Sequence, residues 1–306
     1  MSLIGLLRPE TDLHGVEQKG GESMAMRYWL VDVFAERPLA GNGLTVFPDA
    51  SGMSTELMQS LTRELRQFET AFLQPSADPA RFDLRVFTME EELPFAGHPV
   101  LGAAALLHHL RAGETPARWR LRLPAKEVVV DTSRLGDAIQ ARMDQGAPSF
   151  IGELAPEDTR WFADRFSAER DERYPAQVIS TGLPYLILPV TAAGLAAARQ
   201  RQSLEPRLSA IGASFVYLLD VDAREGRTWD PDGVVEDIAT GSAAGPVAAY
   251  LHRTRHTPVD ETVTVHQGRF AGRPSRMSTR VSADGRIEVG GDVQIIAAAD
   301  LLAELP

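Results

Sequence analysis

The sequence contains no cysteine among its 306 residues. This absence excludes disulfide bonds, thiolate zinc sites, iron–sulfur clusters and cysteine nucleophiles. Basic residues are also few, since 31 Lys and Arg stand against 42 Asp and Glu and give a net charge of −11. Binding to nucleic acid depends on neutralising phosphates with Lys and Arg. We therefore expect no nucleic-acid partner.

Long hydrophobic runs are missing as well. The most apolar stretch, residues 87–107, is interrupted by Glu90, Glu91 and Glu92 and keeps only about a dozen apolar positions, too few to cross a membrane. Residues 1–25 lack the basic segment and sustained apolar stretch of a secretory signal, and we expect this extension to be poorly ordered. These features predict a cytoplasmic protein without a membrane partner.

The apolar stretch itself predicts a helix that is buried on all sides. Gly97-His98-Pro99 opens an Ala- and Leu-rich run, and Pro is well placed in a first helical turn. A helix that is apolar all round has no face that can meet water. We therefore expect a sheet wrapped around this helix, with a Gly-His pair at its N-terminus.

A second segment, residues 238–253, repeats this pattern. Thr240-Gly241-Ser242 falls where Gly97-His98-Pro99 sits, and each turn leads into an Ala-rich helix. Such a repeat indicates two related units. We predict domains at 26–150 and 151–306, with the last strands able to cross between them, and helix N-termini that face each other across a cleft.

The remaining elements follow from hydrophobic periodicity and turn residues. Ser54 is a good N-cap for a helix through about residue 66. Residues 142–149 indicate little regular structure. Strands are predicted at 28–34, 44–47, 70–73, 81–87, 118–130, within 177–190, at 214–221 and within 263–293, and further helices from 156 and over 192–202.

Glu69 is the first candidate for chemistry. It lies between two aromatic residues at the head of an apolar strand. Burial would favour its neutral form and make it a proton carrier near neutral pH. A lone Glu at a strand start is more often solvated, so the residue pattern alone leaves both alternatives open.

His98 is the second candidate. At the start of a buried helix it could be a neutral hydrogen-bond donor, a proton carrier or simply a cap. Metal binding is not indicated, because His252 and His256 are four residues apart but no HExxH motif occurs.

Asp237, Thr240, Gly241 and Ser242 form the third group. Free N–H groups at a helix start bind anions, and Ser or Thr there can either cap the helix or hold a carboxylate. Ser242 is not in a GxSxG elbow, because Ala244 stands two residues after it. Gly41-Asn42-Gly43 is only a weak match to a dinucleotide fingerprint.

Five blocks, in order along the chain, resemble the PhzF-like isomerase family of phenazine biosynthesis, within the diaminopimelate epimerase-like superfamily. They are Asp32-Val33-Phe34 with Gly41-Asn42, then Phe68 to Phe72, Gly97-His98-Pro99, Glu236 to Gly245, and Gln267-Gly268 with Gly272 to Ser275.

The resemblance implies an α/β (α+β) fold of two similar domains, each a mixed β-sheet rolled into a barrel around a central helix. It implies that Glu69 carries a proton without a cofactor, with His98 and Asp237 beside it. The substrate would bind at Gly97, Thr240, Gly241 and Ser242. A homodimer is also implied.

We therefore predict a cofactor-independent isomerase that moves a proton between carbons of a small anionic amino or carboxylic acid. The alternative is a non-catalytic small-molecule binding protein that keeps the family cleft, and a cysteine-type racemase is excluded by composition. The chain departs from the common family pattern in having Gly43 where many members have Pro, and Phe68 where many have Ser.

Overall fold

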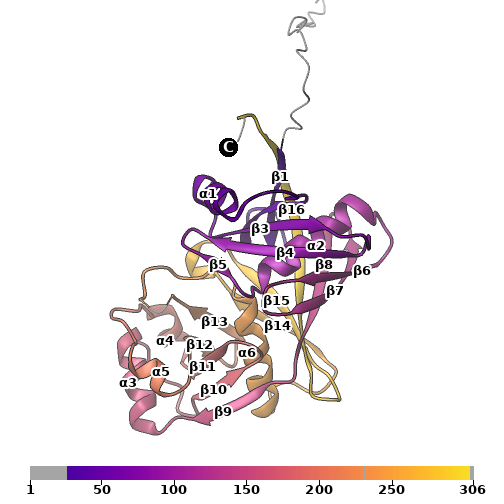
Figure 1. Ribbon diagram of the computed structural model, residues 1–306. Helices are drawn as coiled ribbons and strands as arrows, with labels where there is room; N and C mark the ends of the chain where they lie inside the picture. Colours follow the sequence, from indigo (N-terminus) through magenta and orange to yellow (C-terminus); the bar gives the residue numbers. More distant parts are fainter. Residues whose placement is uncertain (1–25, 231, 304–306) are drawn as a thin grey trace, which may run out of the picture.

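The computed structural model describes residues 26–230 and 232–303, and the predicted extension, 1–25, lies outside these residues. Strands dominate the described chain (Figure 1). They are β1 (Met26–Val33), β2 (Asn42–Phe47), β3 (Glu69–Pro75), β4 (Arg81–Thr88), β5 (Glu92–Leu93), β6 (Ala117–Arg122), β7 (Glu127–Leu135), β8 (Ala138–Gly146), β9 (Ser149–Glu153), β10 (Gln177–Ser180), β11 (Pro184–Pro189), β12 (Phe215–Asp220), β13 (Glu225–Thr228), β14 (Thr262–Gln267), β15 (Ser275–Val281) and β16 (Ile287–Leu301). The helices are α1 (Thr55–Leu65), α2 (His98–Arg111), α3 (Pro156–Phe166), α4 (Ala192–Ala197), α5 (Arg207–Ala210), α6 (Gly241–Arg253) and the 3-10 turn η1 (Arg269–Ala271).

These strands form one continuous sheet. Its order is β1-β2-β3-β4-β6-β7-β8-β16-β15-β14-β13-β12-β11-β10-β9, with β5 paired to β4. Because β16 pairs with β8 and also with β1, the first half of the sheet closes into a barrel. The second half continues from the start of β16 through β15 and curves around α6.

The helix α2 fills the barrel. Its residues from His98 to His108 are all buried, as the sequence predicts for a helix that is apolar all round. Small residues let the sheet approach closely: a β-carbon on Gly102 would lie 2.6 Å from a methyl carbon of Leu44 on β2. Each buried Leu in such a core contributes roughly 1.5–3 kcal/mol to stability.

The two halves repeat the same series of strand pairings. In the first half β1–β2 is antiparallel, β2–β3 parallel, β3–β4 antiparallel and β4–β6 parallel. In the second half β10–β11, β11–β12, β12–β13 and β13–β14 follow the same alternation. The central helix follows β5 in one half and β13 in the other, so the internal repeat seen in the sequence is present in the topology.

The remaining helices cover the outside of the sheet. Helix α1 packs on β3 and β4 with a cluster that includes Phe47, Met58 and Phe72. Its predicted cap is confirmed, because the Ser54 hydroxyl accepts a hydrogen bond from Leu57 N. Helices α3, α4 and α5 form a second outer layer with their own apolar cluster.

Three predictions about local structure are wrong. Residues 142–149 are the end of β8 and the start of β9, because residues facing the core alternate with exposed ones along β8. The single strand predicted at 118–130 is a hairpin, in which β6 and β7 are joined through Pro124. The helix predicted over 192–202 ends at Ala197. The proposed domain boundaries remain a prediction.

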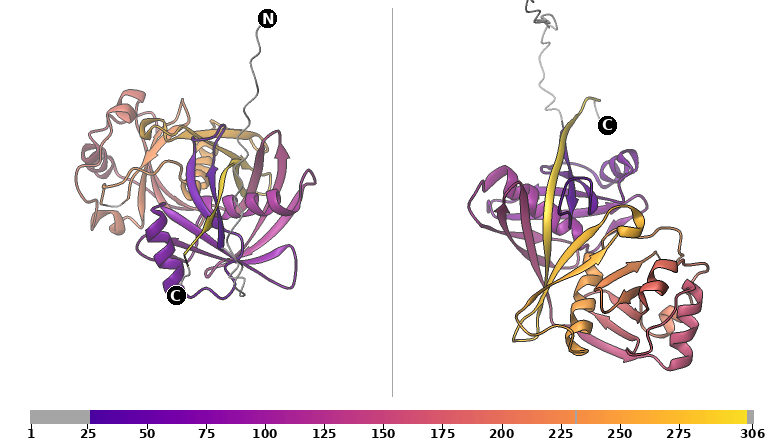
Figure 2. Two further views of the ribbon diagram at one scale, coloured as in Figure 1. Left: turned by 90° about the horizontal axis from the view of Figure 1, so that it is seen from above. Right: turned by 180° about the vertical axis from the view of Figure 1, so that it is seen from behind.

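The long strand β16 belongs to both halves. Its first residues pair with β15 and β8, and its later residues pair with β1. Figure 2 shows it from behind as a long yellow arrow that runs up the side of the first half. The two halves are therefore joined by hydrogen-bonded strands as well as by the chain between β8 and β9.

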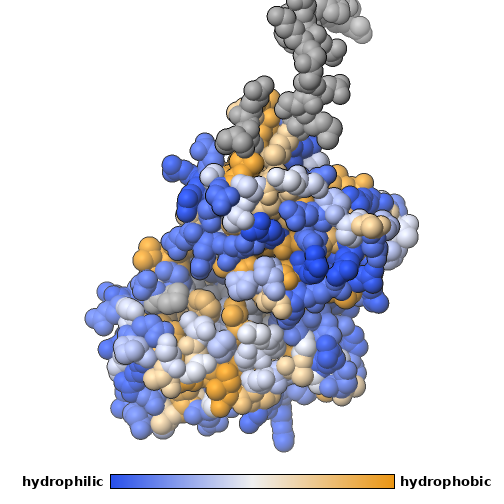
Figure 3. Space-filling view, in the orientation of Figure 1, coloured by the Kyte–Doolittle hydropathy of each residue, from blue (hydrophilic) through white to orange (hydrophobic). Residues whose placement is uncertain are grey.

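The surface agrees with the acidic, polar composition. In the orientation of Figure 3 hydrophilic residues cover most of the visible face, and hydrophobic residues appear in small groups. Among the described residues, none of the helices combines the length and the apolar character that crossing a membrane would require.

Candidate active site

The N-termini of the two central helices meet between the halves of the molecule. A β-carbon on Gly97 would lie 3.0 Å from Ser242 N and 3.2 Å from the carbonyl carbon of Gly241, both backbone atoms. Neither Gly97 nor Thr240 caps its helix with a side chain. The positive ends of both helices are therefore directed at one region, with N–H groups of their first turns available to a negatively charged ligand.

A cavity of about 530 Å³ lies beside these helix starts. All seven residues predicted for the site line it: Glu69, Gly97, His98, Asp237, Thr240, Gly241 and Ser242. They come from β3, α2, the loop after β13 and α6. The structure thus brings the predicted residues together, and their individual roles remain predictions.

Glu69 is the first residue of β3 and lines the cavity. Its side chain is 19% exposed, and its Oε2 atom lies 3.3 Å from His98 Nε2 without a hydrogen-bond partner. Burial, with a smaller contribution from the negative charge of Asp237, raises the pKa of Glu69 to about 8. The carboxyl group can therefore gain and lose a proton near neutral pH.

His98 is held in its neutral form. Burial lowers its pKa to about 4, although Asp237 acts in the opposite direction. Its Nδ1 atom faces the side-chain nitrogen of Asn42 at 3.5 Å. An amide nitrogen can only donate, so Nδ1 is the acceptor and Nε2 carries the ring hydrogen. Nε2 lies 3.3 Å from Glu69 Oε2, and neither atom has a hydrogen-bond partner.

Asn42 connects the two halves at this point. Its Nδ2 atom donates to Asp237 Oδ1 at 3.0 Å and to the carbonyl oxygen of Ala239 at 3.1 Å. The other oxygen of Asp237 accepts from the Thr240 hydroxyl at 2.6 Å. Asp237 is therefore fixed between β2 of the first half and the start of α6.

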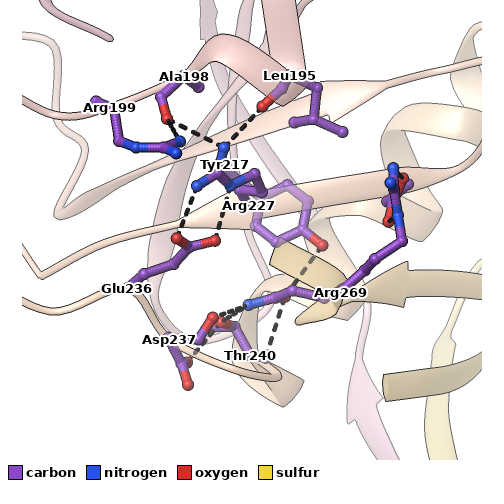
Figure 4. A network of polar contacts seen from close by, with 11 residues as sticks. Leu195, Ala198, Arg199, Tyr217, Arg227, Glu236, Asp237, Thr240 and Arg269 are labelled. Carbon is purple, nitrogen blue, oxygen red and sulfur yellow. Dashed lines mark hydrogen bonds and ion pairs between the residues drawn. The ribbon is translucent and has the colours of Figure 1, made fainter. Parts of the chain in front are cut away.

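Gln267, at the end of β14, holds the same loop from the other side. Its Nε2 atom donates to the carbonyl oxygen of Asp237 and to the Thr240 hydroxyl, each at 2.9 Å. Its Oε1 atom accepts from Thr240 N and from the Tyr217 hydroxyl, each at 3.2 Å. Figure 4 shows these contacts around Asp237 and Thr240. Because all four polar contacts of this amide are made, the turn into α6 is rigid.

Ser242 has a partner that keeps its hydroxyl in place. The Tyr185 hydroxyl on β11 lies 2.7 Å from Ser242 Oγ. Burial raises the pKa of Tyr185 above its usual value, so this phenol stays protonated and can donate to Ser242. Ser242 can then donate its own hydrogen into the cavity.

The turn before β2 is tied to the second half by Arg273. Its guanidinium contacts Asp32 Oδ1 at 2.6 Å and the carbonyl oxygens of Gly41 and Ala40 at 2.7 and 3.0 Å. This turn leads directly into Asn42. The Asp32, Gly41-Asn42 and Arg273 blocks of the sequence are thus one assembly that positions the Asn42 side chain.

Three residues of the site had no role assigned from the sequence. Asn42 and Gln267 stood in the motif blocks, and that position was the only signal available for them. Tyr185 gave no signal, because an aromatic residue in an apolar strand is typical of a core. Within the described ranges no group of three or more His, Asp or Glu could hold a metal ion.

Comparisons with known proteins show which proteins the chain is similar to. Residues 31–298 match the family model described as phenazine biosynthesis-like protein. The chain is 34% identical over 283 residues to a trans-2,3-dihydro-3-hydroxyanthranilate isomerase of Pseudomonas aeruginosa, covering 87% of this chain and 95% of the relative.

Solved structures resemble the whole described fold. A predicted epimerase from Pseudomonas aeruginosa is 55% identical with a TM-score of 0.87, covering 92% of this chain and 100% of that one. A probable proline racemase from Agrobacterium radiobacter is 14% identical with a TM-score of 0.57, covering 91% and 93%, and this likeness concerns the fold alone. The predicted mixed α/β, epimerase-like fold is confirmed.

Proposed function

Because the chain belongs to the phenazine biosynthesis-like family and is an isomerase, we propose that it moves a proton between two carbons of a small carboxylic acid. Glu69 is the general acid and base of this reaction. The single observation that supports this most strongly is the buried, unpartnered Oε2 atom of Glu69 with a pKa of about 8, placed 3.3 Å from a neutral His98.

The reaction needs only one proton carrier. In its ionised form Glu69 takes a proton from a carbon atom activated by the substrate carboxylate or an adjacent double bond, and the C–H electron pair moves into the conjugated system. The protonated Glu69 then returns the proton to a different carbon. A carboxyl group whose pKa lies near the working pH serves both steps, and such catalysis contributes about 10²- to 10⁴-fold.

The negative charge that develops on the substrate is stabilised by the two helix starts. The first-turn N–H groups after Gly97 and Thr240 are the donors, while the Ser242 hydroxyl binds the carboxylate that the substrate carries throughout. Since these dipoles are fixed before the substrate arrives, they need no rearrangement as charge builds up. Substrate binding is therefore assigned to Gly97, Thr240, Gly241 and Ser242.

The cavity favours a substrate with a single acidic group. The residues that line it include Glu90, Glu91 and Asp230 in addition to Glu69 and Asp237. Among the described residues, no Lys or Arg lines the cavity. A second carboxylate would meet like charges at the mouth. Half-exposed apolar side chains from both halves surround the same opening and suit an unsaturated or cyclic carbon skeleton: Phe68, Met89, Leu183 and Val235.

The experiment follows hydrogen exchange into a substrate in heavy water. The first compound to test is trans-2,3-dihydro-3-hydroxyanthranilate, which the name of the relative supplies. Wild-type protein should incorporate deuterium at a carbon position, and Glu69→Gln, which keeps the shape of the side chain, should lose at least about 10²-fold of the rate. Glu64→Gln, an exposed change of the same kind on α1, is the control.

Two results would contradict the proposal. A Glu69→Gln variant that exchanges at the wild-type rate would exclude Glu69 as the proton carrier. Tight binding of a panel of unsaturated monocarboxylic acids without any exchange would favour the alternative, a binding protein that retains the family cleft.

A further inference from the structure

Arg227 on β13 is the largest side chain that is fully buried in the described chain, with only 1% of its surface exposed. Its Nε and Nη2 atoms donate to the two oxygens of Glu236, each at 2.7 Å. Its Nη1 atom donates to the carbonyl oxygens of Leu195 and Ala198 at the end of α4, at 2.8 and 3.0 Å. Figure 4 shows Arg227 between Glu236 and the backbone of Leu195 and Ala198, with Asp237 on the far side of Glu236.

Aromatic rings complete the surroundings of this guanidinium. The Trp229 and Phe270 ring centroids lie 4.6 and 4.5 Å from the Arg227 Cζ atom. Such contacts are strengthened where water is excluded. Arg227 is not among the residues that line the cavity, so it does not meet the substrate.

The residue that Arg227 holds is the immediate neighbour of Asp237. Residues 229 and 236 form an antiparallel bridge, and Asp237 N donates to the carbonyl oxygen of Thr228. In extended chain, successive side chains point to opposite sides. Glu236 accordingly points back to Arg227, whereas Asp237 points into the cavity.

We propose that Arg227 is a positioning residue for the reaction: its two-pronged contact with Glu236 fixes the base of the loop and thereby the place of Asp237 beside Glu69. This rests on the proposed function, in which Glu69 carries the proton. Asn42 and Thr240 bind the Asp237 side chain from the cavity side. On the opposite side, Arg227 binds the neighbouring residue, Glu236.

The chemistry of the contact requires arginine. The planar guanidinium of Arg227 donates four hydrogen bonds in fixed directions, two to a carboxylate and two to backbone carbonyls. A lysine ammonium has the charge but not the planar fork, so it cannot bind both oxygens of Glu236 and the end of α4 together.

The test is Arg227→Lys, with Arg269→Lys as the matched control. Arg269 makes the same two-pronged contact with Glu225, at 2.8 and 2.6 Å, and its side chain is 62% exposed. Its guanidinium also lies 4.2 Å from the centroid of the Phe270 ring, so this control includes any effect that acts through that ring. We expect Arg227→Lys to stay folded by circular dichroism and to lose about 10²-fold in kcat, as displaced catalytic groups do. Arg269→Lys should keep wild-type kcat.

A second readout does not depend on turnover. Carboxyl ¹³C NMR of Glu-labelled protein, with the Glu69 signal assigned by its loss in Glu69→Gln, follows the titration of Glu69 directly. The charged or titratable groups around Glu69 are His98, Asp237 and Tyr185. If Asp237 moves away in Arg227→Lys, the titration midpoint of Glu69 must fall below that of the wild type, because a like charge has left.

The outcomes separate the two proposals. A folded Arg227→Lys with wild-type kcat and midpoint overturns the positioning role, and so does an equal loss in Arg269→Lys. If no proton transfer is found in any variant, the proposed function fails while the midpoint still tests the position of Asp237. Should Arg227→Lys not fold, Glu236→Gln, which keeps the shape of the partner, is measured in the same two ways with the same expectations.

Discussion

The two halves of the molecule have the same series of strand pairings but supply different chemistry. The strand β3 begins with Glu69 and its counterpart β12 begins with Phe215, and both first residues line the cavity. One half therefore places a carboxyl group where the other places an aromatic ring. The repeat gives two helix starts and a shared gap, and the different residues at equivalent places make the gap asymmetric.

The helix starts differ in the same way. Gly97-His98-Pro99 brings an imidazole to the cavity, while Thr240-Gly241-Ser242 brings hydroxyl groups. The first half thus places His98 3.3 Å from Glu69, and the second half holds Asp237 through the Thr240 hydroxyl. Substitutions in both halves test how these differences act.

The largest effect is expected for Gly97→Ala. The new methyl group would lie 3.0 Å from a backbone atom of α6, which cannot rotate away, so the helix starts must separate. We expect activity to fall about 10²-fold. Gly241→Ala should reduce activity less. Its methyl group would also meet an atom at 3.0 Å, but that atom is at the end of the Phe34 side chain, which can shift more easily than backbone.

Steady-state kinetics measure this difference. Gly152→Ala is the control, because a methyl group there meets nothing within 4 Å. Equal activity of Gly97→Ala and wild type would show that the close contact of the helix starts is not needed.

Ser242→Ala should affect binding more than turnover. It removes a donor to the substrate carboxylate, and hydrogen bonds to charged groups contribute about 1.5–3 kcal/mol, so KM should rise about tenfold or more. Tyr185→Phe, which leaves the serine but removes its partner, should raise KM less. A Ser242→Ala variant with unchanged KM and reduced kcat would contradict an anion-binding role.

Asp237→Asn should shift the pH dependence. The negative charge of Asp237 raises the pKa of Glu69, so its removal must lower that pKa from about 8. If Glu69 acts as the base, kcat/KM rises with pH through the Glu69 pKa, and this limb should move to lower pH in the variant. Asp232→Asn, an exposed change in the same loop, is the control. A limb that stays in place, or that moves to higher pH, would refute the coupling of these two carboxyl groups.

The smallest effect is expected away from the cavity, at the caps of α1 and α4, which occupy corresponding places in the two halves. Ser54 accepts from Leu57 N and Thr191 from Gly194 N. Replacing either by Ala should lower the free energy of unfolding by about 1 kcal/mol without changing kcat. Urea denaturation and kinetics measure both, and lost activity in a variant of unchanged stability would contradict this expectation.

The fold was largely predictable because its strongest signals are local. The cap at Ser54 and the two apolar helices could each be identified within a short window of sequence. The repeat followed from comparing two such windows. The strand β8 was missed because its core-facing residues include Ala141 and Gln145, which carry little hydrophobic signal. The hairpin of β6 and β7 was missed because the apolar residues on both sides of Pro124 formed one strand-like pattern.

The site could be predicted in its residues but not in its geometry. The motif blocks contain Glu69, His98 and Asp237, yet only the folded chain shows that Glu69 Oε2 and His98 Nε2 lie 3.3 Å apart. Arg227 shows the limit most clearly. A charged residue in a short strand predicts exposure, and its burial depends on Glu236, Trp229 and the end of α4 together.

The strand β16 has a consequence for how the protein is made. The first half closes only when residues 293–301 pair with β1, the earliest described strand of the chain. On the ribosome this half must therefore wait, with an open edge, until residues 293–301 have emerged. Folding from the N-terminus onward, the usual order for multidomain chains, cannot complete the half that is synthesised first.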